Sequence, residues 1–187
     1  MPALPLPPLP ASLPRPRPGT AKRGTDLFGA GVALVLAALP LLAVAAALVL
    51  TTRRSPLVRE EVAGRGGTTY HRHLFRGAPW VTRYALDGLP QLFDVLRGEM
   101  SLVGPRPLPP GDGNPRERTL VRPGMTGLWQ VSARSDLPWE EMGLLDLHYV
   151  EHHWLGMDLA ILAQTPRAAL RARRPAAAAP RAEVRAA

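Results

Sequence analysis

The carboxylate with the clearest chemical setting in this sequence is Asp87, in the stretch Leu86-Asp-Gly-Leu-Pro-Gln-Leu-Phe93. Apolar residues recur there at three- and four-residue spacing as far as Leu96, which predicts an amphipathic helix. Pro90 fits only a first helical turn, so the helix is expected to begin near Asp87. A carboxylate at that place has two interpretations. It caps the free N–H groups of the helix, or it is held ionised as a nucleophile beside a bound phosphate. Local physics alone favours the cap.

Two arginines stand in loops that proline and glycine make rigid. Arg106 lies within Ser101-Leu-Val-Gly-Pro-Arg-Pro107, and Arg122 lies within Val121-Arg-Pro-Gly-Met-Thr-Gly-Leu-Trp-Gln130. A guanidinium fixed between such residues is well suited to binding phosphate. The alternative is that both are ordinary surface arginines.

A zinc site is a further candidate, because His148-Tyr-Val-Glu-His152 matches the H-x-x-E-H motif of inverted zinc proteases. Two histidines four residues apart on a helix could share a metal ion. However, a short pattern with few fixed positions arises easily by chance, and no third ligand stands out. Zinc is therefore not favoured.

The element that would place this chemistry at a membrane is the uncharged run Leu27–Leu50. Its length suffices to span a bilayer. Basic residues flank both ends, so their distribution selects no orientation. Pro40 near the middle predicts a kink. A kinked spanning helix and a re-entrant hairpin both remain open, and a cleaved signal peptide with Lys22 and Arg23 as its basic region is a less favoured alternative.

Composition narrows the partners. The formal net charge is +8, with 23 Lys and Arg against 15 Asp and Glu, which favours an anionic partner. The basic residues form no compact run with interleaved aromatics, so nucleic acid is not expected. The absence of cysteine excludes disulfides, thiolate metal sites and cysteine nucleophiles. The segment 1–21 is proline-rich, and 171–187 consists mainly of Ala, Arg and Pro, so both are predicted to be disordered.

The sequence between the apolar run and the C-terminal tail predicts a small domain that contains both strands and helices. A Gly-Arg-Gly-Gly turn after residue 63 separates two short β-branched pieces and predicts a hairpin. No Gly-Lys-Ser/Thr follows it, so a phosphate-binding P-loop is not expected. Residues 138–163 read as helices.

Three long blocks of this chain closely resemble the bacterial sugar transferases, the monotopic phosphoglycosyl transferases that start exopolysaccharide and glycoconjugate synthesis. The blocks are LDGLPQLFDVLRGEMSLVGPRP, VRPGMTGLWQVSARSDLPWEE and LDLHYVEHHWLGMDLAIL. The resemblance covers most of residues 22–170, in order. It implies an α+β protein on the cytoplasmic face of the bacterial plasma membrane. A re-entrant membrane helix broken at Pro40 would occupy 22–54, and a small, mostly helical catalytic domain with a short β-hairpin would occupy 55–170.

The same resemblance implies a reaction. A sugar-1-phosphate passes from a nucleotide sugar, usually a UDP-sugar, to polyprenyl phosphate, UMP is released, and Mg²⁺ assists. Asp87 matches the nucleophile and is also a candidate Mg²⁺ ligand. Arg106 and Arg122 match phosphate-binding arginines of the family's motifs. A further family arginine shortly before the nucleophile aligns with Thr82 or Arg83, which makes Arg83 the third candidate.

The clearest departure from the family is Gly88, which stands where the family's motif has glutamate. That glutamate would help to hold Mg²⁺ or act as a base. Asp94 and Glu99 lie further along and do not replace a residue adjacent to Asp87. The favoured hypothesis is the transferase itself. The alternatives are a catalytically impaired relative that binds lipid phosphate or a partner, and a single-span membrane protein without lipid chemistry.

Overall fold

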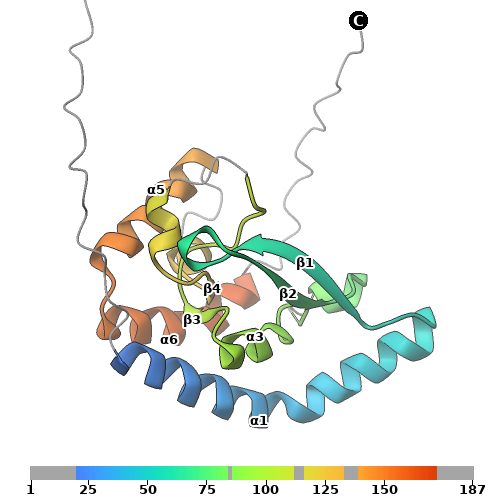
Figure 1. Cartoon of the computed structure of the whole chain (residues 1–187). Coiled ribbons are helices and arrows are strands. Elements are labelled where there is room, and N and C mark those ends of the chain that lie inside the picture. Colours follow the sequence, from blue (N-terminus) through green and yellow to red (C-terminus); the bar gives the residue numbers. More distant parts are fainter. Residues whose placement is uncertain (1–19, 84–85, 112–115, 133–138, 172–187) are drawn as a thin grey trace, which may run out of the picture.

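A long apolar helix, α1 (Thr20–Thr52), runs along one side of the molecule, and the rest of the described chain lies on its inner side (Figure 1). The computed structural model describes residues 20–83, 86–111, 116–132 and 139–171. The predicted segments 1–21 and 171–187 therefore lie almost wholly outside the described residues. Helix α1 contains Pro40 and bends near its middle in Figure 1. A proline inside a helix removes one hydrogen bond and crowds the preceding turn, which explains a bend there.

The predicted hairpin is confirmed. Strand β1 (Leu57–Ala63) pairs with β2 (Thr69–Phe75) in an antiparallel register that sets Leu57 opposite Phe75. The turn includes the 3₁₀ segment η1 (Arg65–Gly67), where Gly66 and Gly67 have φ of 73° and 79°. That left-handed conformation suits glycine, so the glycines serve the turn.

The amphipathic helix begins later than expected. After α2 (Pro79–Arg83), helix α3 spans Gln91–Arg97 with Pro90 at its N-cap, and no side chain caps it. The interpretation of Asp87 as the helix cap is therefore wrong. Asp87 instead lies in a turn in which the Gln91 N–H donates to the Gly88 carbonyl. The other end is as predicted, because Gly98 is the C-cap with φ of 90°.

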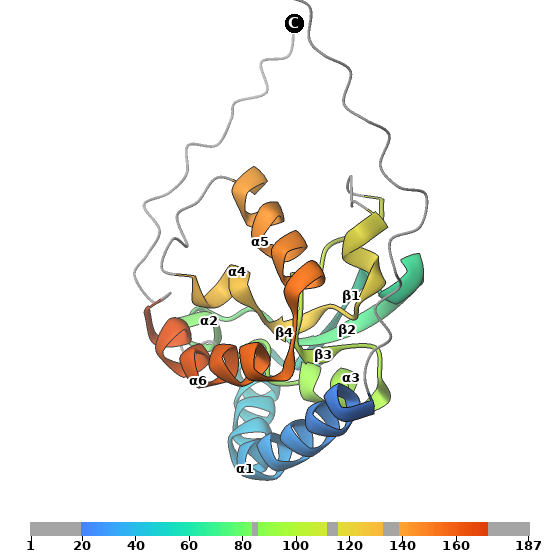
Figure 2. The same ribbon diagram turned by 90° about the vertical axis from the view of Figure 1, so that its left-hand side faces the viewer.

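A short parallel pair that the sequence did not predict joins the two arginine loops. Strand β3 (Ser101–Val103) pairs with β4 (Gly124–Thr126). The remaining elements are η2 (Arg116–Leu120), α4 (Leu128–Val131), α5 (Trp139–His152) and α6 (Leu155–Arg171). Helices α5 and α6 agree with the helical reading of 138–163. Figure 2 shows α6 lying across the end of the domain that faces α1.

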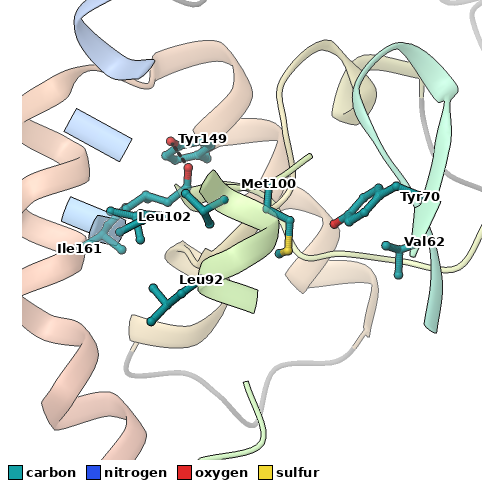
Figure 3. Packing of buried hydrophobic residues seen from close by; sticks show 10 residues of the cluster. Val62, Tyr70, Leu92, Met100, Leu102, Tyr149 and Ile161 are labelled. Carbon is teal, nitrogen blue, oxygen red and sulfur yellow. Dashed lines mark hydrogen bonds between the residues drawn. The ribbon is translucent and has the colours of Figure 1, made fainter. Parts of the chain in front are cut away.

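The main hydrophobic core connects the helices to the hairpin. Figure 3 shows Ile161 and Tyr149 at one end of the buried cluster, Leu102 and Leu92 in the middle, and Met100 followed by the hairpin residues at the other. Side chains of α1 such as Leu34 pack against this cluster. The long helix is thus part of the domain's core.

Both ends of α1 are fastened to the same domain. Near its start, Asp26 is only 5 % exposed and accepts hydrogen bonds from the Ser101 hydroxyl (2.7 Å) and the Leu102 N–H (3.1 Å). Near its end, Val44 and Leu48 are buried in a second cluster with Phe75. One helix therefore makes two separate sets of contacts with one folded unit.

Between those contacts, the outer face of α1 is apolar and exposed. Phe28, Leu36 and Leu39 are among its exposed side chains, with Leu39 81 % exposed. Among the described residues, α1 is the one helix whose length and composition suffice to cross a membrane. An exposed apolar face of this size is typical of a surface that contacts lipid or another protein.

Candidate active site

Asp87 is held against the hairpin by its backbone. The Phe75 N–H at the end of β2 donates to the Asp87 carbonyl at 2.9 Å. The residue is neither fully buried nor fully exposed. Its position in a turn before α3 keeps it on a loop that two ordered elements flank, which suits a residue that must meet a substrate.

A groove of about 1000 Å³ lies between α1, the β1–β2 hairpin and α3, and its lining reaches Pro90, three residues after Asp87. Its floor and one wall are apolar, formed by α1 side chains around the bend together with Phe75, Pro90 and Phe93. The polar side chains that line it are Ser55, two cationic groups, Arg59 and Arg97, and the imidazole of His73. An apolar channel with basic groups on its rim fits a molecule that has a hydrocarbon part and an anionic head.

Beneath this rim lies a buried carboxylate, Asp94. Its side chain is 0 % exposed, and its Oδ2 accepts from the His73 backbone N–H at 2.8 Å. Its Oδ1 lies 2.7 Å from His73 Nδ1 and 3.7 Å from Arg97 Nη1. Buried charges require partners of this kind. Sequence reasoning missed the contact between His73 and Asp94, because neither the strand pattern nor the helix pattern brings these positions together.

Arg106 lies over an aromatic ring on another side of the domain. Its guanidinium carbon is 5.8 Å from the centre of the Trp129 ring, and its Nη1 is 3.7 Å from the Met142 sulfur. Its backbone N–H donates to Asp146 at 3.1 Å, and Asp146 also pairs with Arg118. Burial raises the pKa of Asp146 and lowers the pKa of Arg118, each against the opposing attraction of the partner. A buried ion pair thus fixes the backbone from which Arg106 projects.

Three glycines allow the two arginine loops to cross. A Cβ on Gly124 would lie 2.1 Å from the Gly104 nitrogen, and one on Gly127 would lie 2.1 Å from the Gly104 carbonyl oxygen. No side chain fits between backbones this close. The glycines of both motif loops therefore have a structural reason, which is the contact that also brings β3 beside β4.

Arg122 lies at the opposite end of α3 from Asp87. Its Nε donates to the carbonyl of Gly98, the C-cap of α3, at 2.6 Å. Burial lowers its pKa, and the nearby charges of Arg23 and Arg65 lower it further, although an arginine remains protonated at neutral pH. Asp87 and Arg122 are thus separated by α3, about 10 Å for a helix of 7 residues.

The remaining predicted site residues are Arg83 and the two histidines of the zinc pattern. Arg83 is the last residue of α2, and its side chain lies outside the described part. The His148 and His152 rings stack with centroids 4.6 Å apart, and His152 Nδ1 lies 3.2 Å from the His148 carbonyl. Within the described residues, no three side chains of the usual ligand types gather as a metal site.

Gly88 leaves position 88 without a side chain, although its backbone does not demand glycine, since its φ is not in the left-handed region. A Cβ there would meet the Gln91 side-chain nitrogen at 3.1 Å, which a small shift of that side chain would relieve. The backbone at position 88 would therefore accept a Cβ. Asp87 is accordingly the one carboxylate of the turn formed by residues 86–90.

Comparison with known proteins relates these features to a family. A family model described as bacterial sugar transferase matches residues 76–172. An undecaprenyl-phosphate galactose phosphotransferase of Salmonella typhimurium is 43 % identical over 100 residues, which are 49 % of this chain and 20 % of the relative. The exopolysaccharide production protein ExoY of Sinorhizobium fredii is 42 % identical over 88 residues, which are 44 % of this chain and 39 % of the relative.

A third relative has a similar name and coverage. An undecaprenyl-phosphate glucose phosphotransferase of Komagataeibacter xylinus is 39 % identical over 99 residues, covering 44 % of this chain and 19 % of the relative. The chain thus spans about a fifth to two fifths of the length of these relatives. The segment 76–172, which the family model matches, contains Asp87, the groove residues of α3 and both arginine loops.

Proposed function

This chain belongs to the bacterial sugar transferase family, and we propose that it transfers a sugar-1-phosphate from a nucleotide sugar to polyprenyl phosphate at the membrane. The donor is proposed to be a UDP-sugar, with UMP as the leaving product. Such a step would initiate the synthesis of an exopolysaccharide or glycoconjugate. Two of the relatives are named as undecaprenyl-phosphate phosphotransferases, and undecaprenyl phosphate is a polyprenyl phosphate.

The observation that carries the proposal is the groove between α1, the hairpin and α3. Its apolar wall on α1 suits an isoprenoid chain, which cannot be solvated by water. Arg59 and Arg97 on its rim suit the phosphate at the end of that chain. Pro90 and Phe93, from the segment that follows Asp87, also line it. The proposal places the acceptor in this groove, whose lining reaches Pro90, three residues after the proposed nucleophile.

The chemistry follows from a carboxylate nucleophile. An Asp87 oxygen attacks the phosphorus that carries the sugar, the bond from that phosphorus to UMP breaks, and UMP leaves with the electron pair. An oxygen of polyprenyl phosphate then attacks the same phosphorus, and the Asp87 carboxylate leaves. The product is a polyprenyl diphosphate sugar. Arg106, Arg83 and Arg122 are the proposed phosphate contacts, although Arg122 is the one that lies beyond the far end of α3.

Magnesium is proposed as the cofactor that arrives with the donor diphosphate. Mg²⁺ is commonly bound by one or two carboxylates plus substrate phosphates. The Asp87 carboxylate is a hard oxygen donor in the right turn, so the chain fits an ion held mainly by substrate. When bound, the ion would neutralise part of the charge on the diphosphate.

The membrane arrangement is proposed to be re-entrant, with α1 dipping into the cytoplasmic leaflet. Its two ends contact one domain. Near the start of α1, Asp26 accepts a hydrogen bond from Ser101 of β3, and near its end Leu48 packs in a cluster with Phe75 of β2. A straight crossing would carry those ends to opposite faces of the bilayer. The bend at Pro40 and the apolar outer face are what a helix needs to enter and return.

The test is transfer of radiolabel from UDP-sugars to polyprenyl phosphate in membranes. The wild type is expected to label the lipid, and Asp87→Asn is expected to abolish the label. Unchanged activity of Asp87→Asn would sink the mechanism.

Gly88 favours a second candidate, an impaired relative that keeps the fold and binds lipid phosphate. Silence of the wild type in the same assay, with activity restored by Gly88→Glu, would support that candidate instead. The Cβ that this substitution adds would meet only the Gln91 side-chain nitrogen, at 3.1 Å, which a small shift of that side chain would relieve.

A further inference from the structure

His73 lines the same groove, Asp94 is buried behind it, and the pair has no assigned role in the reaction. Position 88 has no side chain, so the turn formed by residues 86–90 offers no base beside Asp87. His73 is the one imidazole that lines the groove. The question is whether its geometry fits a group that takes a proton there.

The contact with Asp94 defines which ring nitrogen is available. An ionised carboxylate only accepts hydrogen bonds, so His73 Nδ1, 2.7 Å from Asp94 Oδ1, carries its hydrogen toward it. The other nitrogen, Nε2, is then left with a lone pair. Asp94 also holds the backbone N–H of the same residue, and it is fully buried, so the imidazole is fixed at two points. A carboxylate that fixes a histidine tautomer in this way is a recurring feature of catalytic bases.

The position of His73 relative to Asp87 is also suitable. His73 and Phe75 are two residues apart on β2 and line the same groove. That spacing is about 7 Å along a strand. The Phe75 N–H binds the Asp87 carbonyl, which places the turn that carries the nucleophile beside the strand that carries His73.

We propose that His73 is the general base of the second half of the reaction and that Asp94 is its positioning residue. The inference rests on the proposed transferase function. As the oxygen of the singly protonated acceptor phosphate attacks the sugar-linked phosphorus, its proton passes to His73 Nε2. The bond from phosphorus to Asp87 breaks, and its electron pair returns to the carboxylate. The imidazolium that forms is stabilised by Asp94.

The experiment separates the two half-reactions of the purified full-length protein. Incubation with a UDP-sugar alone measures UMP release and the phosphosugar adduct by intact mass. Addition of polyprenyl phosphate then measures discharge of the adduct. His73→Asn keeps a donor near the Nδ1 position for Asp94 but removes Nε2. We expect its adduct to form at the wild-type rate and its discharge to slow by about 10²- to 10⁴-fold.

Two further variants test specificity. His71→Asn makes the same change on the same strand at an exposed position, and it should discharge at the wild-type rate. Asp94→Asn removes the charge behind the imidazole. It should lower kcat for discharge by about 10-fold or more while adduct formation stays at the wild-type rate, because Asp94 is buried and acts on the reaction through His73.

The outcomes separate this inference from the function on which it rests. Slow discharge with normal adduct formation in His73→Asn is the expected result. Discharge at the wild-type rate would overturn the role of His73 and leave the transferase function standing. Equal losses in both half-reactions would mean that the pair is only structural, which also overturns it. A wild type that forms no adduct and transfers no label would refute the function and the inference together.

Discussion

Replacing Asp26 tests how α1 is held to the domain. In Asp26→Ala, the Ser101 hydroxyl and the Leu102 N–H both lose a charged acceptor in a buried site. A hydrogen bond to a charged group contributes about 1.5–3 kcal/mol, and removing one partner of a buried polar set costs the unpaired groups their hydration as well. Part of this loss in stability is offset, because the variant has no carboxylate to desolvate on folding. The net loss should be about 3–5 kcal/mol in the free energy of unfolding.

The assay is urea unfolding of the detergent-solubilised protein, followed by tryptophan fluorescence. Asp26→Asn keeps an oxygen for the Leu102 N–H, so its loss should be smaller, about 1 kcal/mol. Thr25→Ala is the matched control, since the exposed Thr25 hydroxyl donates to the Lys22 carbonyl within the same helix and, among the described residues, to no other group. A loss in Asp26→Ala below about 1 kcal/mol, or equal to that of the control, would refute the reasoning that this buried contact anchors α1.

Three other predictions follow from the same structure. Because the chain has no cysteine, Thr20→Cys and Arg54→Cys can each be labelled alone; the re-entrant arrangement predicts labelling from the same side of the membrane, and opposite sides would contradict it. Gly124→Ala should destabilise the protein by about 3 kcal/mol or more in urea unfolding, because its Cβ would overlap the Gly104 nitrogen. The control is Gly143→Ala, in a helix with open space around this position, which should be neutral or stabilising by up to about 1 kcal/mol. Removal of divalent cations with EDTA should strongly reduce label transfer, and added Mg²⁺ should restore it; full activity in EDTA would remove the metal from the proposal.

The parts of the fold that depend on local sequence were predictable. A turn rich in glycine between β-branched segments predicted the hairpin. Gly98 predicted the end of α3, where the structure gives it the left-handed φ that favours glycine. The start of α3 was misplaced, because a proline is accepted at the N-cap as well as in the first turn, and only the backbone bonds of residues 86–92 distinguish these.

The contacts that build the site depend on residues far apart in the chain. Strands β3 and β4 have three residues each, too few for a periodic pattern, and their pairing brings together positions about twenty residues apart. Asp94 lies on a buried face of an amphipathic helix, where the pattern leads one to expect an apolar residue. Its partner, His73, comes from a different element, and only the folded structure reveals their contact.

The central claim is that Asp87 becomes covalently bound to the phosphosugar, and intact-mass spectrometry tests it most directly. Purified wild type incubated with its UDP-sugar, without acceptor, should gain the mass of one sugar phosphate and release UMP in equal amount. Fragmentation should place the added mass on Asp87, and Asp87→Asn should gain none. Lipid labelling by a wild type that never acquires this mass, or an adduct that persists in Asp87→Asn, would contradict the account.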